Sequence, residues 1–344
     1  MILINTISLP LSYLFKCITS STAYIFNNTI GKVTELLLRT ILYSNYLPNN
    51  SSIMKKREVR LIKDFQAEKL SCLKTAFLFK SISPNRTGNI FIFLTSKKCS
   101  NIHPRQFQHY LERGSDVVIF DADTYKDPIY HSKDLQKLIK YLKTEKKVKK
   151  FAVHSYCTTG QYAIDALAKL NDKNISLICD RVFGDFEKLA TTFTLFARLW
   201  FIKDIIKRLD CKAIKNIENI PGKVLFMWPD NDVILDYKKG SKKDNLTKDL
   251  YLAYSKKQKE KATVVHLHNY SHWQYPYTVL DQKKLDEFLK ENKILSSLYQ
   301  STEDKRFINI DKLKRFYRAP PLNRFKKDIL PYLIKSWFQR WTII

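Results

Sequence analysis

Glycine is scarce in this sequence, with only seven occurrences among 344 residues. An average chain of this length contains roughly three times as many. Tight turns and close backbone approaches favour glycine, because it has no Cβ and adopts positive φ freely. Many active sites are built on such turns, so a site in this chain must form its turns mainly from other residues.

Cysteine occurs six times, but without the spacing of a disulfide framework or of a zinc site. No CxxC pair is present, and no His and Cys residues have zinc-ligand spacing. Several of the cysteines lie in apolar runs, as reduced cysteines in cytoplasmic-type proteins do. We therefore expect no disulfide, no structural metal and no cofactor. The six are Cys17, Cys72, Cys99, Cys157, Cys179 and Cys211.

Long apolar runs are also absent. No stretch of about 18 uninterrupted apolar residues occurs, so a membrane-spanning helix is not expected. The apolar segment 1–56 is interrupted by Pro10 and Lys16, and its start, MILINT, lacks the basic residues of a signal peptide. An amphipathic segment fits it better, either packed on the core or lying in a membrane interface.

Acidic residues are outnumbered by basic ones, 33 to 60, for a formal net charge of +27. This excess favours an anionic partner, although AT-rich coding would also enrich lysine without selection for charge. In residues 305–344, aromatic and aliphatic residues alternate with Lys and Arg. That segment predicts contact with an anionic membrane surface; docking on the core and binding of a protein partner are the alternatives. Nucleic acid is not expected, because no binding motif accompanies the charge.

From about residue 57, strand-like and helix-like segments alternate. Short apolar runs bounded by polar loops are typical of strands that are buried on both faces. Such runs are NIFIFL (89–94), DVVIFDAD (116–123), VKKFAVHS (148–155), ISLICDRVF (175–183), KVLFMWPD (223–230) and ATVVHLHNY (262–270). Helical patterns separate most of them, which predicts an α/β fold with a doubly wound, mostly parallel sheet.

The same pattern indicates the domain organisation. The core is predicted at 57–290, between the apolar segment 1–56 and a basic, aromatic-rich extension at 291–344. Residues 184–221 are helical in pattern and lie between two core strands, which predicts a cap.

Three reactive side chains follow core strands, and reactive groups in a doubly wound sheet gather at the carboxyl ends of its strands. Cys157 follows the strand that contains FAVHS, Asp232 follows KVLFMW, and His272 follows ATVVHLHNY. The chain order nucleophile, acid, histidine is the order of the α/β-hydrolases.

The stretch FAVHSYCTTGQYAIDAL resembles the nucleophile elbow of α/β-hydrolases, which reads small-x-nucleophile-x-small-Gly before a helix. Ser155 and Thr159 stand at the two places where glycine is usual, Cys157 at the nucleophile place, and Gly160 follows. The segments at 89–100, 116–128 and 223–235 are similar to the oxyanion strand, the next strand and the acid-bearing segment of that family.

The resemblance implies a site with defined roles. Cys157 is the nucleophile, His272 generates its thiolate, and Asp232 orients the histidine. Backbone N–H groups of Thr158 and of Thr95–Ser96 form the oxyanion hole.

Other acids and histidines are open as alternatives. Asp180 and Asp230 are alternative acids, and each site residue could instead have a structural role. His266 and His268 have strand spacing and are expected to line the sheet.

Two functions follow from this pattern. The first is hydrolysis or transfer of an acyl ester or thioester, on a small-molecule and lipid-like substrate. The alternative is a catalytically silent α/β-hydrolase-fold module that binds a membrane or a protein, since glycines are missing at both the elbow and the oxyanion loop. A cytoplasmic or peripheral membrane location is expected. The Ile, Lys and Asn bias together with the basic tail also resembles secreted effectors of intracellular bacteria.

Overall fold

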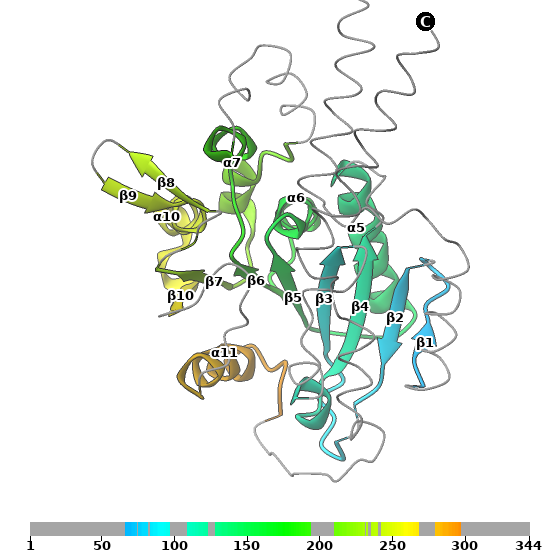
Figure 1. Cartoon of the computed structure of the whole chain (residues 1–344). Coiled ribbons are helices and arrows are strands. Elements are labelled where there is room, and N and C mark those ends of the chain that lie inside the picture. Colours follow the sequence, from blue (N-terminus) through cyan, green and yellow to red (C-terminus); the bar gives the residue numbers. More distant parts are fainter. Residues whose placement is uncertain are drawn as a thin grey trace, which may run out of the picture.

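A computed structural model describes most of the predicted core (Figure 1). The predicted terminal segments 1–56 and 305–344, and residue His272, lie outside the described residues. The described residues are 66–73, 75–81, 83–96, 109–122, 128–193, 210–230, 232, 235–239, 242–267 and 279–296.

An eight-stranded sheet forms the centre of the molecule, with strand order β1-β2-β4-β3-β5-β6-β7-β10 (Figure 1). Pairs β1–β2 and β2–β4 are antiparallel, and every other pair is parallel. The predicted mostly parallel α/β sheet is therefore confirmed. The strands are β1 (Glu68–Lys69), β2 (Ala76–Phe79), β3 (Ile90–Ser96), β4 (Asp116–Ala122), β5 (Phe151–Tyr156), β6 (Ile175–Asp180), β7 (Val224–Pro229) and β10 (Ala262–Leu267).

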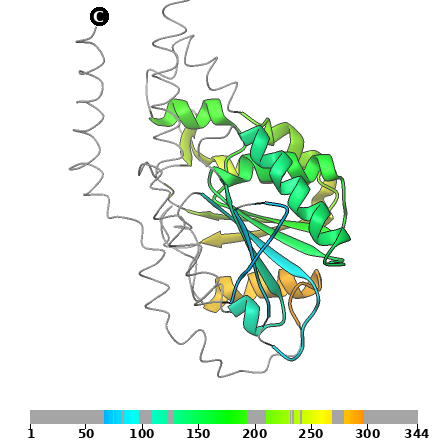
Figure 2. The ribbon, with the colours of Figure 1, turned by 90° about the vertical axis from the view of Figure 1, so that its right-hand side faces the viewer.

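Helices cover both faces of the sheet (Figure 2). The first face packs against α5 (Pro128–Thr144), α6 (Thr159–Leu170) and α10 (Leu246–Gln258). The second packs against α11 (Val279–Glu291) and the helical residues 109–112. Shorter elements are α7 (Phe186–Phe193), α9 (Ala213–Asn216), and the 3-10 helices η3 (Ile217–Asn219) and η4 (Lys259–Lys261). No described helix is both long enough and apolar enough to cross a bilayer.

Strand β3 shows why the apolar runs become central strands. Ile92 and Leu94 join the cluster under α5 and α6, whereas Phe91 and Phe93 join the cluster under α11. Successive side chains of a strand point to opposite faces, so a continuous apolar run contributes to both clusters at once.

A second, two-stranded sheet was not predicted from the sequence. It is an antiparallel hairpin of β8 (Asp236–Lys239) and β9 (Lys242–Asn245), directly before α10. Its register places Lys238 opposite Lys243 and Lys239 opposite Lys242. The segment has no alternating apolar residues, so the usual sequence signal of a strand is missing.

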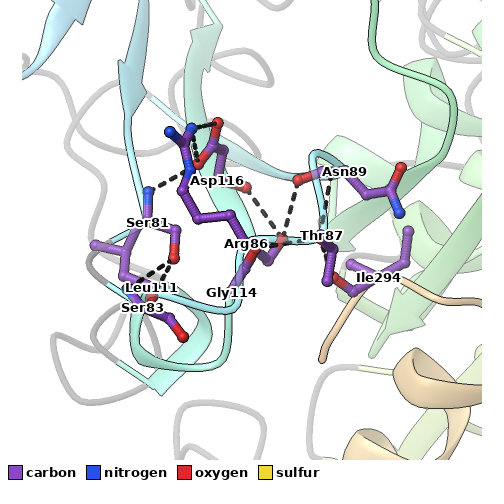
Figure 3. Close-up of polar contacts among 10 residues, drawn as sticks. Ser81, Ser83, Arg86, Thr87, Asn89, Leu111, Gly114, Asp116 and Ile294 are labelled. Carbon is purple, nitrogen blue, oxygen red and sulfur yellow. Dashed lines mark hydrogen bonds and ion pairs between the residues drawn. The ribbon is translucent and has the colours of Figure 1, made fainter. Parts of the chain in front are cut away.

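Polar contacts hold the amino end of the sheet (Figure 3). At the start of β4, the Asp116 carboxylate accepts hydrogen bonds from Arg86 Nη2 at 2.7 and 2.9 Å and from the Ser81 backbone N–H at 2.7 Å. Thr87 Oγ1 lies 3.1 Å from the carbonyl oxygen of Ile294, which follows α11. These contacts fasten the loop before β3 and the chain after α11 at the end of the sheet opposite the candidate site.

Candidate functional site

Cys157 occupies the turn between β5 and α6, where the predicted elbow lies. Its φ is +51°, in the left-handed region that residues other than glycine seldom adopt. Its backbone N–H donates to the Asp180 carbonyl at 3.2 Å, and its own carbonyl accepts from the Gly160 N–H at 3.2 Å. A cysteine strained in this way at a strand-to-helix turn is held by its surroundings, as residues at functional sites often are.

Thr159 and Ser155, which replace the usual glycines, lie on either side of the turn, at the start of α6 and near the end of β5. Thr159 Oγ1 accepts a hydrogen bond from the Tyr156 N–H at 2.8 Å and lies 3.0 Å from the Tyr156 carbonyl oxygen. Ser155 is fully buried, and its hydroxyl donates to the Ile178 carbonyl at 2.8 Å. Both side chains are short, so their hydroxyl groups reach nearby backbone groups. These hydrogen bonds stabilise the backbone on either side of Cys157.

Gly160 is required by close packing. A Cβ atom at this position would lie 2.0 Å from Val182 Cγ1. The first turn of α6 therefore lies directly against the chain that follows β6. The one glycine that remains in the motif stands where a larger residue would collide.

The predicted oxyanion residues lie at the amino end of α6 and at the carboxyl end of β3. Thr158 directly follows Cys157 and precedes α6, so its backbone N–H is at the amino end of that helix, which favours negative charge. Thr95 and Ser96 are the last two residues of β3, which neighbours β5 in the sheet with Phe93 opposite His154. The loop 97–108 lies outside the described residues.

Asp232 lies at the carboxyl end of the sheet, just after β7, and is fully buried. Its Oδ1 accepts a hydrogen bond from the Leu235 N–H at 3.0 Å, and its own N–H donates to Asp236 Oδ2 at 2.8 Å. These bonds fix the turn that presents the carboxylate. The predicted partner His272 follows the neighbouring strand β10 but lies outside the described residues.

Asp180, an alternative acid, is already bound at the end of β6. Its Oδ1 accepts from Arg181 Nε at 2.7 Å, and its Oδ2 lies 3.1 Å from Arg181 Nη2 and 3.3 Å from His154 Nε2. Burial opposes ionisation of this carboxyl, but the charges and hydrogen bonds of Arg181 and His154 outweigh it and hold its pKa below the ordinary value. Asp180 is therefore ionised, and its backbone carbonyl also accepts a hydrogen bond from Cys157.

Arg181 lies near the candidate site but was not predicted from the sequence to be part of it. Its side chain is fully buried, its φ is +51°, and its N–H donates to the Met227 carbonyl at 2.8 Å. The guanidinium also lies 4.8 Å from the centre of the Tyr156 ring, next to Cys157. The available signal was an Asp-Arg pair inside the apolar run ISLICDRVF.

Asp230 and His266 lie apart from the buried acids. Asp230 is 45% exposed, and its Oδ1 is 4.0 Å from Nδ1 of His266, whose side chain is 49% exposed. His266 meets the ring of Trp228 edge-on, with 4.8 Å between the ring centres. The side chain of His266 thus lies on the surface at the edge strand. Between the two acids that follow β7, the buried Asp232 is the better-held carboxylate.

Cys157 differs from the other described cysteines. Cys179 and Cys211 are buried, and burial raises the pKa of the Cys179 thiol. Cys72 is half-buried, and burial raises its pKa as well. Cys157 is half-buried and lies at the apex of a turn at the carboxyl end of the sheet. Within the described ranges, no three His, Cys, Asp or Glu side chains converge as metal ligands would.

The fold is similar to solved esterase and hydrolase structures. Est1E from Butyrivibrio proteoclasticus aligns with a TM-score of 0.50 and 15% identity, over 66% of this chain and 98% of that one. An alpha-beta hydrolase from Vibrio vulnificus aligns with a TM-score of 0.49 and 16% identity, over 74% and 92%. No protein-family model matches this sequence, and comparison with curated proteins gives no significant match. The described core of this chain has the α/β-hydrolase fold.

Proposed function

We propose that this protein is an acyl ester or thioester hydrolase, or an acyltransferase, with Cys157 as its nucleophile. The observation that carries the proposal is the backbone of Cys157, at φ +51° in the turn between β5 and α6. That conformation presents a side chain above the end of the sheet and next to the amino end of a helix. The Cys157 thiol is half-buried, so a substrate can reach it.

In the proposed reaction, His272 removes the thiol proton and the Cys157 sulfur attacks the acyl carbonyl carbon. Asp232 orients the imidazole and stabilises its charged form. The oxyanion accepts hydrogen bonds from the backbone N–H groups of Thr158 and of Thr95–Ser96. The leaving alcohol or thiol takes the proton from His272. Water or an acceptor then gives a proton to His272 and attacks the thioester carbonyl carbon, and the Cys157 sulfur leaves and takes that proton back.

The choice of Asp232 as the acid rests on the bonds of the two buried carboxylates. Asp180 is engaged by Arg181 and His154. Asp232 follows β7, whose neighbour β10 leads toward His272, and it is buried in a turn closed by hydrogen bonds. This position supports Asp232 as the residue that orients a histidine from the next loop.

We also propose that the acyl substrate is lipid-like. This proposal rests on the apolar segment 1–56 and the basic, aromatic-rich segment 305–344. Sequences of this kind adhere to anionic membranes through apolar contact and charge. Both segments lie outside the described residues, so the membrane role stays a prediction from the sequence.

Alkylation rates of individual cysteines test the proposed nucleophile. With iodoacetamide at pH 7, we expect Cys157 to react at least about tenfold faster than Cys72, because a histidine-paired thiol supplies more thiolate. Cys72 is also free and half-buried, and because burial raises its pKa, the comparison with the His272→Ala variant separates the effect of the histidine from that of burial. Peptide mass spectrometry after a time course gives both rates.

The variant His272→Ala serves as the control. Cys157 in that variant should react no faster than an ordinary thiol, because its base is gone. Equal rates for Cys157 and Cys72 in the unmodified protein would contradict the proposal and favour the catalytically silent module.

A further inference from the structure

The outer face of α5 carries a basic groove whose residues have no part in the proposed hydrolase chemistry. Three exposed lysines, Lys133, Lys137 and Lys140, recur at intervals of four and three residues, so they share one face of the helix. They open onto a cavity of about 460 Å³ between α5 and the turn that precedes β2. The cavity is lined by Cys72, Lys133, Gln136, Lys137, Lys140, Tyr141 and Thr144.

The three lysines of the groove differ in ion pairing from the other lysines of this region. In the described part of the chain, none of these three lysines is in an ion pair with a carboxylate. The neighbouring lysines of the same region are paired, Lys143 with Asp172 and Lys146 with Glu68. Like charges at this spacing destabilise a helix, and an anionic ligand would offset that repulsion.

The spacing of the lysines indicates what kind of anion fits. With a rise of about 1.5 Å per residue, Lys133 and Lys140 are separated by roughly 10 Å along the helix axis. One phosphate group is too small to contact both ends of such a row, whereas two or three linked phosphates match it. The polar groups of Gln136, Tyr141 and Thr144 already take part in local hydrogen bonds. Charge is therefore the main basis of recognition.

We propose that this groove binds an anion that carries two or more phosphate groups, either a free solute or a lipid headgroup. The site is independent of the proposed hydrolase activity. The opposite face of α5 packs on the sheet through Leu135, Leu138 and Leu142, so the groove faces away from the core. A variant that loses anion binding can therefore still be tested for hydrolysis, and a variant that loses hydrolysis can be tested for anion binding.

The test measures binding of inorganic tripolyphosphate by calorimetry. For the triple variant Lys133→Gln, Lys137→Gln, Lys140→Gln, we expect affinity to fall about tenfold for each lysine that contacts a phosphate. The matched control, Lys283→Gln, Lys284→Gln, Lys290→Gln, removes the same charge from exposed lysines of α11 and should bind as the unmodified protein does. Inorganic monophosphate should bind much more weakly than tripolyphosphate.

Protection of Cys72 gives a second readout at the site itself. Because Cys72 lines the cavity, tripolyphosphate should slow its alkylation and leave that of Cys157 unchanged. Vesicles that contain phosphatidylinositol bisphosphate distinguish the source of the phosphates. If the groove variant loses vesicle binding, the ligand is a headgroup, and if it loses only tripolyphosphate binding, the ligand is a solute. The proposal is overturned if the unmodified protein does not bind tripolyphosphate, if the groove and control variants lose affinity equally, or if tripolyphosphate does not protect Cys72.

Discussion

The variant Cys157→Ala is expected to lower turnover of the best acyl ester or thioester substrate by at least about 10³-fold. The reason is that no acyl-enzyme can form without the sulfur, and the oxyanion groups and substrate binding alone supply only a small remainder of the rate. Initial rates on a panel of short- and long-chain acyl substrates measure the effect.

Two controls separate chemistry from folding. Alanine has the same Cβ as cysteine, so the strain at φ +51° stays the same and the thermal midpoint should change little. Cys72→Ala, at the other half-buried free thiol, should retain full turnover. Undiminished activity in Cys157→Ala would rule out the cysteine as the nucleophile.

The variant Asp180→Asn is expected to lower the free energy of unfolding by about 3–5 kcal/mol. The substitution keeps the shape of the side chain but removes the charge that balances Arg181, whose guanidinium is fully buried. A buried charge without its partner is strongly unfavourable, whereas removing both charges can be nearly neutral. Urea unfolding at pH 7 measures the loss.

A double variant isolates the cause. Adding Arg181→Met to Asp180→Asn removes the unbalanced charge and should restore a large part of the lost stability. Two results would contradict the role given to the ion pair. One is that Arg181→Met restores no stability, and the other is that Asp180→Asn alone lowers the free energy of unfolding by less than about 1 kcal/mol.

The Asp180 carboxylate also makes the stability of the fold depend on pH. The pKa of Asp180 is lower in the folded protein than its ordinary value, so this carboxylate stabilises the fold fully above about pH 4. Its contribution declines as the pH falls toward the lower folded value. The Asp180→Asn variant should lack this component of acid destabilisation.

The sheet was predictable because its central strands are apolar runs. Their side chains join the hydrophobic clusters on both faces of the sheet. The helices at 246–258 and 279–291 were predictable as well, since polar residues separate their buried positions at helical spacing. The β8–β9 hairpin was not, because its lysines give no alternating apolar pattern. Its two ends are joined by a backbone hydrogen bond from the Leu246 N–H to the Leu235 carbonyl at 3.0 Å, a contact that the residue types there do not indicate.

Sequence reasoning predicted the positions of Cys157 and Asp232, which follow β5 and β7, whereas the place of His272 stays a prediction. The order of Cys157, Asp232 and His272 along the chain follows from strand ends alone. That Thr159 and Ser155 support the elbow depends on which backbone groups lie nearby, as their hydrogen bonds show. Arg181 was missed because a buried charge is recognised only when its partner is known.

Trapping of the acyl-enzyme tests whether Cys157 is the nucleophile. The protein is mixed with an excess of a slowly hydrolysed thioester, quenched in acid within the first turnover, and digested for mass spectrometry. We expect the peptide that contains Cys157 to gain the mass of one acyl group, and no such gain in the variant Cys157→Ala. Turnover of the substrate with the acyl group on a different residue, or with none on Cys157, would contradict the assignment of Cys157 as the nucleophile.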